Sequence, residues 1–237
     1  MSGAGPAAPR VVSLVPSATE SLLAWGLVPV ACTRFCEQPD LPHVGGTKDP
    51  DVAAVVRLRP DLVVMCEEEN LREHHDELVA AGVATFTFRV DGVEDVAPQL
   101  AELAEAVGVP FSPGELPPAP VGPPARRAFV PIWRRPWMSL SGSTYGSSLL
   151  GRLGIANVFA DADARYPEVT LEQAAALRPD VVLLPTEPYP FKERHRAEVA
   201  PVAPALLVDG HDLFRWGTRT PAALVRLHRL LAPGGSS

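Results

Sequence analysis

Residues Leu58–Met65 read L-R-P-D-L-V-V-M, and residues Leu177–Leu184 read L-R-P-D-V-V-L-L. In both copies, apolar residues at helical spacing precede a proline, which cannot continue a helix, and four apolar residues follow the aspartate. Such an apolar run is typical of a strand that is buried on both faces of a parallel sheet. Each copy therefore predicts a helix, a short turn and a buried strand, which is the pattern of an α/β protein.

The two copies lie half a chain length apart, which indicates two related lobes rather than a solenoid of many short repeats. A second similarity supports this duplication. Val11–Leu14 is followed by P-S-A-T-E and S-L-L, and Met138–Leu140 is followed by S-G-S-T-Y and another S-L-L. Both stretches predict a strand, a polar turn and a helix whose N-terminus is capped by Ser or Thr.

A segment dense in proline separates the two halves and predicts an extended, stiff connector. We expect a flexible N-terminus at 1–9, an N-terminal α/β lobe at 10–108, a linker at 109–125 and a C-terminal α/β lobe at 126–233. Each lobe should hold a parallel sheet flanked by helices, with the ligand in a cleft between the lobes.

The composition excludes some partners. The formal net charge of −7 comes from 28 acidic and 21 basic residues without a block of like charge. Binding to nucleic-acid phosphates needs a clustered basic face, so we expect no nucleic-acid partner. The sequence also lacks an apolar run long enough to predict a membrane span.

The N-terminus and the cysteines bear on the compartment. Met1–Pro9 lacks the basic and apolar regions of a secretory signal. Cys32, Cys36 and Cys66 make an odd count, which an oxidising compartment tolerates poorly. Both observations predict a cytoplasmic protein, with an extracytoplasmic location as the alternative if a signal has been removed.

Loops that follow the expected strands hold the candidate ligand contacts, because ligands of open α/β sheets bind beyond the carboxyl ends of the strands. In the first lobe the candidates are Ser17, Arg34, Phe35, Cys36, Lys48, Glu67 and Glu68. In the second lobe they are Trp133, Trp137, Tyr145, Trp216 and Arg219. We expect the second-lobe aromatic side chains to form apolar walls and the cations to meet anionic ligand groups. Glu67 would accept hydrogen bonds or reach a metal.

Several stretches together resemble the helical-backbone substrate-binding proteins of ABC importers, in particular the cobalamin-binding and metal-receptor members. They are Val11–Glu20, Thr33–Pro39, Val44–Pro50, Leu58–Val64 with Glu67–Asn70, and Asp209–Arg219. The resemblance implies two lobes bridged by one helix and a ligand such as a corrinoid, haem or ferric siderophore. It also implies an ABC permease as partner if the chain is exported. Residues 110–124 depart from the family because they are too rich in proline for the bridging helix, of which residues 100–107 would be the remainder.

These observations favour a non-catalytic binding protein for a bulky small-molecule ligand, without a catalytic residue. They identify no cofactor, since a corrinoid or metal chelate would be the ligand, and they leave any metal ligands open. The alternative is a cytoplasmic enzyme that has recruited the receptor fold, with Cys36 or the Glu67–Glu69 run as its reactive groups. A thiol near Arg34 could ionise more easily, which is the basis of that alternative.

Overall fold

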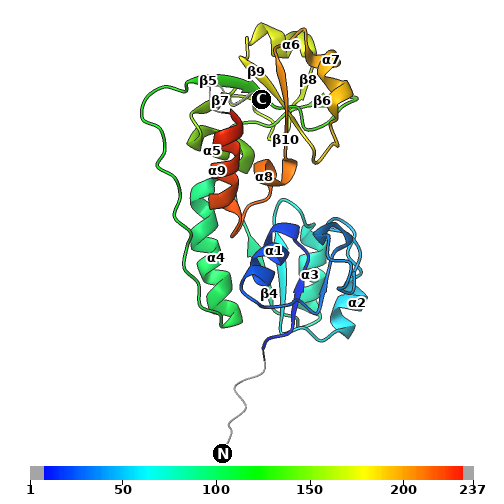
Figure 1. Cartoon of the computed structure of the whole chain (residues 1–237). Helices are drawn as coiled ribbons and strands as arrows, with labels where there is room; N and C mark the ends of the chain where they lie inside the picture. The colour runs from blue at the N-terminus through cyan, green and yellow to red at the C-terminus, as the bar shows by residue number, and fades with distance from the viewer. Residues whose placement is uncertain (1–7, 232–237) are drawn as a thin grey trace, which may run out of the picture. The chain divides into compact units, whose positions relative to one another are not determined.

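The computed structural model describes residues 8–231. The chain divides into two compact units (Figure 1). Unit 1 comprises Met1–Val90 and Glu94–Pro113, and unit 2 comprises Asp91–Val93 and Gly114–Ser237. Each unit is built around one four-stranded parallel sheet with helices, so the predicted α/β class is confirmed.

The sheet of unit 1 has the order β2-β1-β3-β4, and all of its neighbouring strands are parallel. The strands are β1 (Val11–Ser13), β2 (Ala31–Cys32), β3 (Leu62–Cys66) and β4 (Thr85–Phe88). The helices are α1 (Pro16–Ala24), the 3-10 turn η1 (Arg34–Cys36), α2 (Val52–Arg57), α3 (Arg72–Ala80) and α4 (Val93–Val107), whose first residue falls in unit 2. Strand order reverses between β1 and β3, so their carboxyl ends mark the switch point where α/β sheets bind ligands.

Unit 2 repeats this arrangement with the order β10-β9-β5-β7, again parallel throughout. These strands are β5 (Arg126–Phe129), β7 (Ile155–Asn157), β9 (Val181–Pro185) and β10 (Ala205–Val208). A separate antiparallel pair consists of β6 (Trp137–Met138) and β8 (Glu168–Val169). The helices are α5 (Tyr145–Arg152), α6 (Leu171–Ala176), the 3-10 turn η2 (Glu193–His195), α7 (Arg196–Val199), α8 (Gly210–Phe214) and α9 (Thr220–Leu231).

The core of each unit lies against its sheet. In unit 1, Val12 and Val63 of the central strands pack with Val55 of α2 and Leu78 of α3, and all four are fully buried. In unit 2, the corresponding cluster contains the buried residues Phe129, Val182, Leu184 and Val199. Burial of such apolar side chains, worth about 1.5–3 kcal/mol each, is the main stabilisation that holds helices on the sheets.

The L-R-P-D motif forms the same structure in both units. Its arginine, Arg59 or Arg178, has a left-handed backbone with φ of 47° or 52°, and the helix ends before it. A residue before proline avoids the α region, which explains why α2 and α6 end earlier than the proline itself requires. The aspartate then contacts the chain at the start of the neighbouring central strand.

That aspartate closes the amino edge of each sheet. The Arg10 N–H donates to the Asp61 carboxylate at 2.7 Å, and the Arg127 N–H donates to Asp180 at 2.7 Å. The guanidinium of the same arginine donates to the motif leucine carbonyl, Leu58 at 2.7 Å or Leu177 at 2.9 Å. We call these two sets of contacts the aspartate clasps. The same atoms make these contacts in both units, which supports the duplication inferred from sequence.

The second sequence similarity is only partly confirmed. Val11–Ser13 is a strand and both helices form, but α1 begins after Val15 without the expected Ser or Thr side-chain cap. Thr144 caps α5 by accepting a hydrogen bond from the Ser147 N–H, as expected. Of the strand expected at Met138–Leu140, only Met138 lies in a strand, β6, which pairs antiparallel with β8 outside the main sheet. The strand that pairs with β9 as β1 pairs with β3 is β5, which lies earlier in the chain.

Helix α4 is longer than the remnant expected at residues 100–107. It spans fifteen residues, and its buried side chains Val96, Leu100, Leu103 and Val107 follow helical spacing. Pro98 lies inside the helix on an exposed position, and it obscured the first half of this pattern. Residues 109–124 contain neither helix nor strand.

Candidate ligand-binding site

The switch point of unit 1 is closed by one buried amide side chain. Asn70 accepts a hydrogen bond from the Cys66 N–H at 2.8 Å through its Oδ1. Its Nδ2 donates to the carbonyls of Thr47 at 2.8 Å and Leu14 at 3.3 Å. Asn70 therefore joins the ends of β1 and β3 to the loop at residues 45–48. Its role could not be inferred from sequence, because its partners lie up to 56 residues away in the chain.

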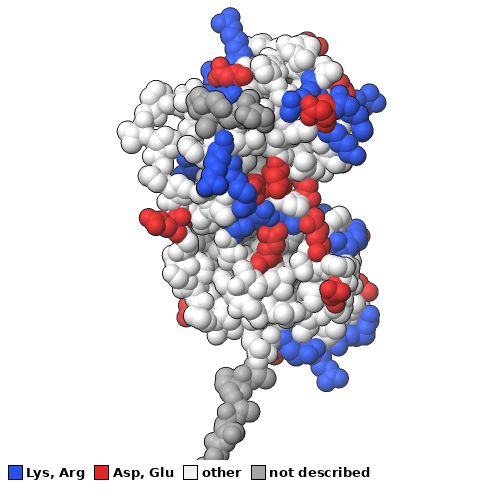
Figure 2. Space-filling model, viewed as in Figure 1, with Lys and Arg blue, Asp and Glu red and all other residues white. Residues whose placement is uncertain are grey.

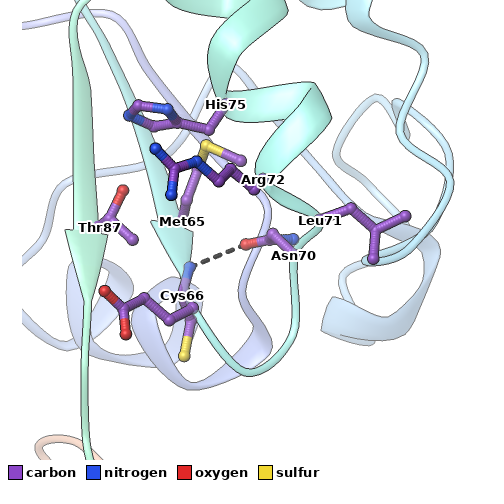
Figure 3. A pocket seen from close by; sticks show the side chains of 8 residues that line it. Met65, Cys66, Asn70, Leu71, Arg72, His75 and Thr87 are labelled. Atoms are coloured by element: carbon purple, nitrogen blue, oxygen red, sulfur yellow. Dashed lines mark hydrogen bonds between the residues drawn. The ribbon is translucent and has the colours of Figure 1, made fainter.

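A pocket of about 450 Å³ opens beside this junction (Figure 3). Arg72 and His75 extend into it from α3, and Thr87 extends from β4 on the opposite side. The complete lining consists of Met65, Cys66, Glu67, Asn70, Leu71, Arg72, His75 and Thr87. Its volume lies within the range of about 300–1,000 Å³ that is common for small-molecule sites. Of the predicted site residues, only Glu67 lines it.

Arg34 and Phe35 form an exposed platform at the end of β2. The Phe35 side chain is 48% exposed, and the Arg34 guanidinium carbon lies 4.8 Å from the centre of its ring. Arg34 Nη2 also donates to both carboxylate oxygens of Asp49, at 3.0 and 3.1 Å. Gly46 leaves room for this pair, because a Cβ there would lie 2.7 Å from Arg34 Nη2. A flat aromatic face with a cation beside it suits a conjugated ligand.

The other exposed candidates of unit 1 are partly engaged within the unit. Lys48 Nζ donates to the Glu68 carbonyl, which ties the 45–48 loop to the residues after β3. The Glu67 carboxylate lies 3.9 Å from Arg89 Nε. Ser17 is 3% exposed within α1, so its hydroxyl does not face solvent as a free ligand contact would.

Cys36 lies in the protein interior, with 1% of its surface exposed. Its Sγ receives a hydrogen bond from Thr19 at 3.2 Å and contacts the Thr33 hydroxyl at 3.3 Å. Hydrogen bonding from the Cys32 thiol, together with these hydroxyls, lowers the pKa of Cys36 to about 6. The thiol is therefore acidic, but its burial keeps it from contacting a substrate in this conformation.

Unit 2 contains an aromatic cluster that includes two of the predicted tryptophans. Trp133 is 44% exposed and meets Tyr189 edge to face with the ring centres 5.6 Å apart. Trp137 stacks on Phe191 with an interplanar angle of 5°. Phe191 is buried and also contacts Tyr189. Trp137 thus packs against the core, whereas Trp133 leaves much of its ring open to a ligand.

The remaining candidates of unit 2 are held inside it. Trp216 is 5% exposed and belongs to the core. The Tyr145 hydroxyl bonds Thr220 at 3.0 Å, and burial raises the pKa of Tyr145 to about 12. Arg219 donates to the buried Asp212 carboxylate at 2.9 Å. These positions follow strands in sequence, but the side chains turn inward.

A charged group at the carboxyl ends of β9 and β10 was not chosen from the sequence. The Glu187 carboxylate lies 2.9 Å from His211 Nε2 and 3.5 Å from Arg215 Nη2. Glycine at position 210 lets the Glu187 backbone come this close, because a Cβ there would lie 2.4 Å from the Glu187 nitrogen. The Gly210 N–H also donates to the Thr186 hydroxyl. This edge is the counterpart in unit 2 of the edge where Glu67 lies in unit 1.

Charged side chains of both signs are interspersed over the face drawn in Figure 2, and much of that face is uncharged. Among residues 8–231, no helix is long and apolar enough to cross a bilayer.

Comparison with known proteins shows that this fold is similar to that of two-lobed binding proteins. Residues 11–111 match a family described as periplasmic binding protein. The resemblance to helical-backbone substrate-binding proteins is therefore confirmed.

A vitamin B12-binding protein of Yersinia pestis is 28% identical over 195 residues, which cover 75% of this chain and 70% of that protein. A periplasmic vitamin B12 binding protein of Vibrio cholerae superposes with a TM-score of 0.74 at 20% identity, covering 93% of this chain and 95% of that one. A periplasmic heme binding protein from Pseudomonas aeruginosa gives 0.78 at 22% identity, covering 97% and 95%.

The comparisons correct the expected location. The matched family and both structures are described as periplasmic, so an extracytoplasmic location is indicated and the cytoplasmic prediction is wrong. The odd cysteine count misled that prediction, because it takes no account of which thiols are close enough to pair. The same proteins are binding proteins, which supports binding over the enzyme alternative.

Proposed function

We propose that this chain is a receptor for a bulky conjugated ligand, with a corrinoid as the first candidate. The observation that carries the proposal is the Arg34–Phe35 platform at the carboxyl edge of unit 1. An exposed aromatic ring beside a guanidinium provides apolar contact for a flat macrocycle and a charge for its anionic substituents. The vitamin B12-binding relatives make a corrinoid the first ligand to test.

Contacts from each unit contribute to this proposal separately. In unit 1, Phe35 and Arg34 contact the ligand, and the pocket lined by Arg72 and His75 accepts a polar substituent. A pocket of about 450 Å³ is smaller than an intact corrinoid, so it would hold a side group and not the macrocycle. In unit 2, the exposed ring of Trp133 is the aromatic contact. Lys48, Glu67 and Glu68 remain candidates for polar contacts.

A thermal-shift measurement tests the proposal. Purified protein is heated with cyanocobalamin, haemin, a ferric siderophore or a divalent metal salt, each in excess. A ligand present at 100 times its Kd stabilises the folded state by about 2.7 kcal/mol, which raises Tm measurably. We expect the corrinoid to raise Tm and bare metal ions to leave it unchanged. A shift with haemin alone would replace the corrinoid by a porphyrin, and no shift with any compound would contradict the proposal.

A permease partner is part of the same proposal. Helical-backbone substrate-binding proteins deliver their ligands to the permeases of ABC importers, and we infer that the ligand-loaded chain docks to such a permease. The test is uptake of labelled cobalamin by a bacterial strain that has the B12 permease but lacks its binding protein. Expression of this chain behind an export signal should restore uptake, and failure of exported, ligand-binding protein to restore it would exclude that permease.

A further inference from the structure

Two of the three cysteines come together in unit 1. Cys32 ends β2 and Cys36 ends η1, and they are 0% and 1% exposed. Only three residues separate them in the chain, and the Thr19 and Thr33 hydroxyls contact Cys36 Sγ at 3.2 and 3.3 Å. The two thiols are also close enough to shift each other's pKa in opposite directions. No part of the proposed ligand site uses either sulfur.

The sheet order separates the third cysteine from Cys32. Cys66 lies on β3, and β1 runs between β3 and β2. Strands two positions apart are separated by about 9.5 Å, whereas the Cα atoms of a disulfide lie within about 7 Å. In addition, Ser13 is the register partner of both Cys32 and Val64, so Cys66 is displaced two residues further along. Cys66 therefore cannot bond Cys32 without rearrangement of the sheet.

We propose that Cys32 and Cys36 form an intramolecular disulfide when the chain meets an oxidising compartment, while Cys66 stays a thiol. All three sulfurs are free thiols in the structure, so the proposal concerns a modification of this pair. Closing the bond places the two sulfurs about 2.05 Å apart. One disulfide and one buried thiol account for all three cysteines, so the odd count is compatible with an extracytoplasmic location.

The chemistry is thiol–disulfide exchange with a small disulfide as the oxidant. The Cys36 thiolate attacks one sulfur of the oxidant, forms a mixed disulfide and releases the first thiolate. Cys32 then loses its proton and attacks Cys36 Sγ, which releases the second thiolate. Two electrons and two protons thus pass from the protein to the oxidant, which ends as two thiols. Because both sulfurs are buried in the folded chain, this exchange takes place while the chain folds, before unit 1 closes around them.

The bond would restrain a functional segment. Only Thr33, Arg34 and Phe35 separate the two cysteines, so the disulfide would close a small ring that carries the Arg34–Phe35 platform. A restrained platform loses less conformational freedom when ligand binds. This consequence rests on the proposed function, whereas the existence of the bond does not.

Thiol counting tests the bond without any ligand. Reduced, denatured full-length protein is refolded in a glutathione buffer rich in the oxidised form, quenched with acid, denatured and alkylated with iodoacetamide. We expect one alkyl group per chain, at Cys66, and an unalkylated mass lower by two hydrogen atoms than that of the reduced protein. Protein refolded with a strong reductant should take three alkyl groups.

Variants assign the pair. Cys66→Ser should take no alkyl group after oxidation, whereas Cys32→Ser and Cys36→Ser should each keep two free thiols per chain. Three alkyl groups on oxidised wild-type protein would overturn the proposal. A glutathione adduct that does not close, a bridge mapped to Cys66, or a dimer between chains would also overturn it. If the Cys32 or Cys36 variant fails to fold, the counts for wild type and Cys66→Ser still decide.

Discussion

The Asp61 carboxylate accepts a hydrogen bond from the Arg10 backbone N–H at 2.7 Å, at the point where the chain enters β1. In return, the Asp61 N–H donates to the Arg10 carbonyl at 2.8 Å. The same reciprocal pair joins Asp180 and Arg127, with distances of 2.7 and 2.8 Å. The aspartate of each L-R-P-D motif is therefore explained by sheet assembly, and it need not touch a ligand.

Asp61→Ala should lower the free energy of unfolding by about 1 kcal/mol, because it removes the acceptor of the Arg10 N–H on an exposed edge. Asp61→Asn keeps an acceptor oxygen and should lose less. Urea unfolding of the three proteins measures both values. Equal stability of the alanine variant and wild type would show that water replaces the clasp without cost.

Asn70→Ala should lower the free energy of unfolding by about 2–3 kcal/mol, since it leaves the buried Cys66 N–H and the Thr47 carbonyl without a partner. Asn70→Asp is the matched control for size. Its carboxylate can still accept from Cys66 but would face two carbonyl oxygens, so it should also destabilise. The prediction fails if Asn70→Asp unfolds at the same urea concentration as wild type.

Two adjacent glycines should respond differently to alanine. Gly45 has a φ of +92°, and a Cβ there would lie 2.4 Å from the Asp49 carbonyl oxygen, so Gly45→Ala should cost about 2 kcal/mol or more. A Cβ at Gly46 meets only the movable ends of Arg34 and Asp49. Gly46→Ala should keep near wild-type stability but displace Arg34 from Phe35 and weaken ligand binding several-fold. Thermal unfolding and ligand titration separate the two effects, and a Gly46→Ala variant with unchanged affinity would remove Arg34 from the site.

Two tryptophans four residues apart provide a second contrast. Trp133→Ala should reduce ligand affinity by about tenfold while leaving Tm nearly unchanged, because its ring is 44% exposed. Trp137→Ala should lower the free energy of unfolding by about 2 kcal/mol, because its ring stacks on the buried Phe191. Fluorescence titration and urea unfolding test each variant. If Trp133→Ala lowers stability and Trp137→Ala lowers ligand affinity instead, the roles given to the two tryptophans are wrong.

Asp212 makes stability depend on pH at the acid end. Arg226 and Arg219 hydrogen-bond its buried carboxylate and hold its pKa below the ordinary value. A depressed folded pKa gives stability that is present above the unfolded pKa of about 3.9 and is lost as pH falls through the folded value. Asp212→Asn should therefore be less stable than wild type at neutral pH and show a smaller loss of stability on acidification below pH about 4. Urea midpoints measured at several pH values check this, and parallel curves would contradict it.

The fold could be predicted from sequence where local pattern and tertiary role agree. Leu62–Met65 and Val181–Leu184 are continuous apolar runs after a proline, and both are buried central strands. Strand β5 was missed because it begins with two arginines and only its second half is buried. Pro98 similarly hid the first turns of α4, although a proline on the exposed face of a helix can be accommodated.

The site was less predictable, because a loop position does not determine where a side chain points. Arg34, Phe35 and Trp133 are at least partly open to solvent, but Tyr145 and Trp216 turn into the core. Asn70 could not be ranked from sequence, since its importance comes from the distant carbonyls of Leu14 and Thr47. Burial and long-range polar pairing are properties of the folded chain, and residue type alone gives only a prior for them.

The aspartate clasps lie at the amino edges of the sheets, at the starts of β1, β3, β5 and β9, whereas the candidate ligand residues follow the strands. The contacts that fix the order of the strands and the candidate ligand contacts thus lie at opposite ends of the same strands. Evolution can exchange the recognition loops without disturbing the contacts that set strand order, and an engineer can do the same. Segments such as residues 33–48 are natural units for grafting, because a loop transplanted from another receptor would inherit an intact scaffold.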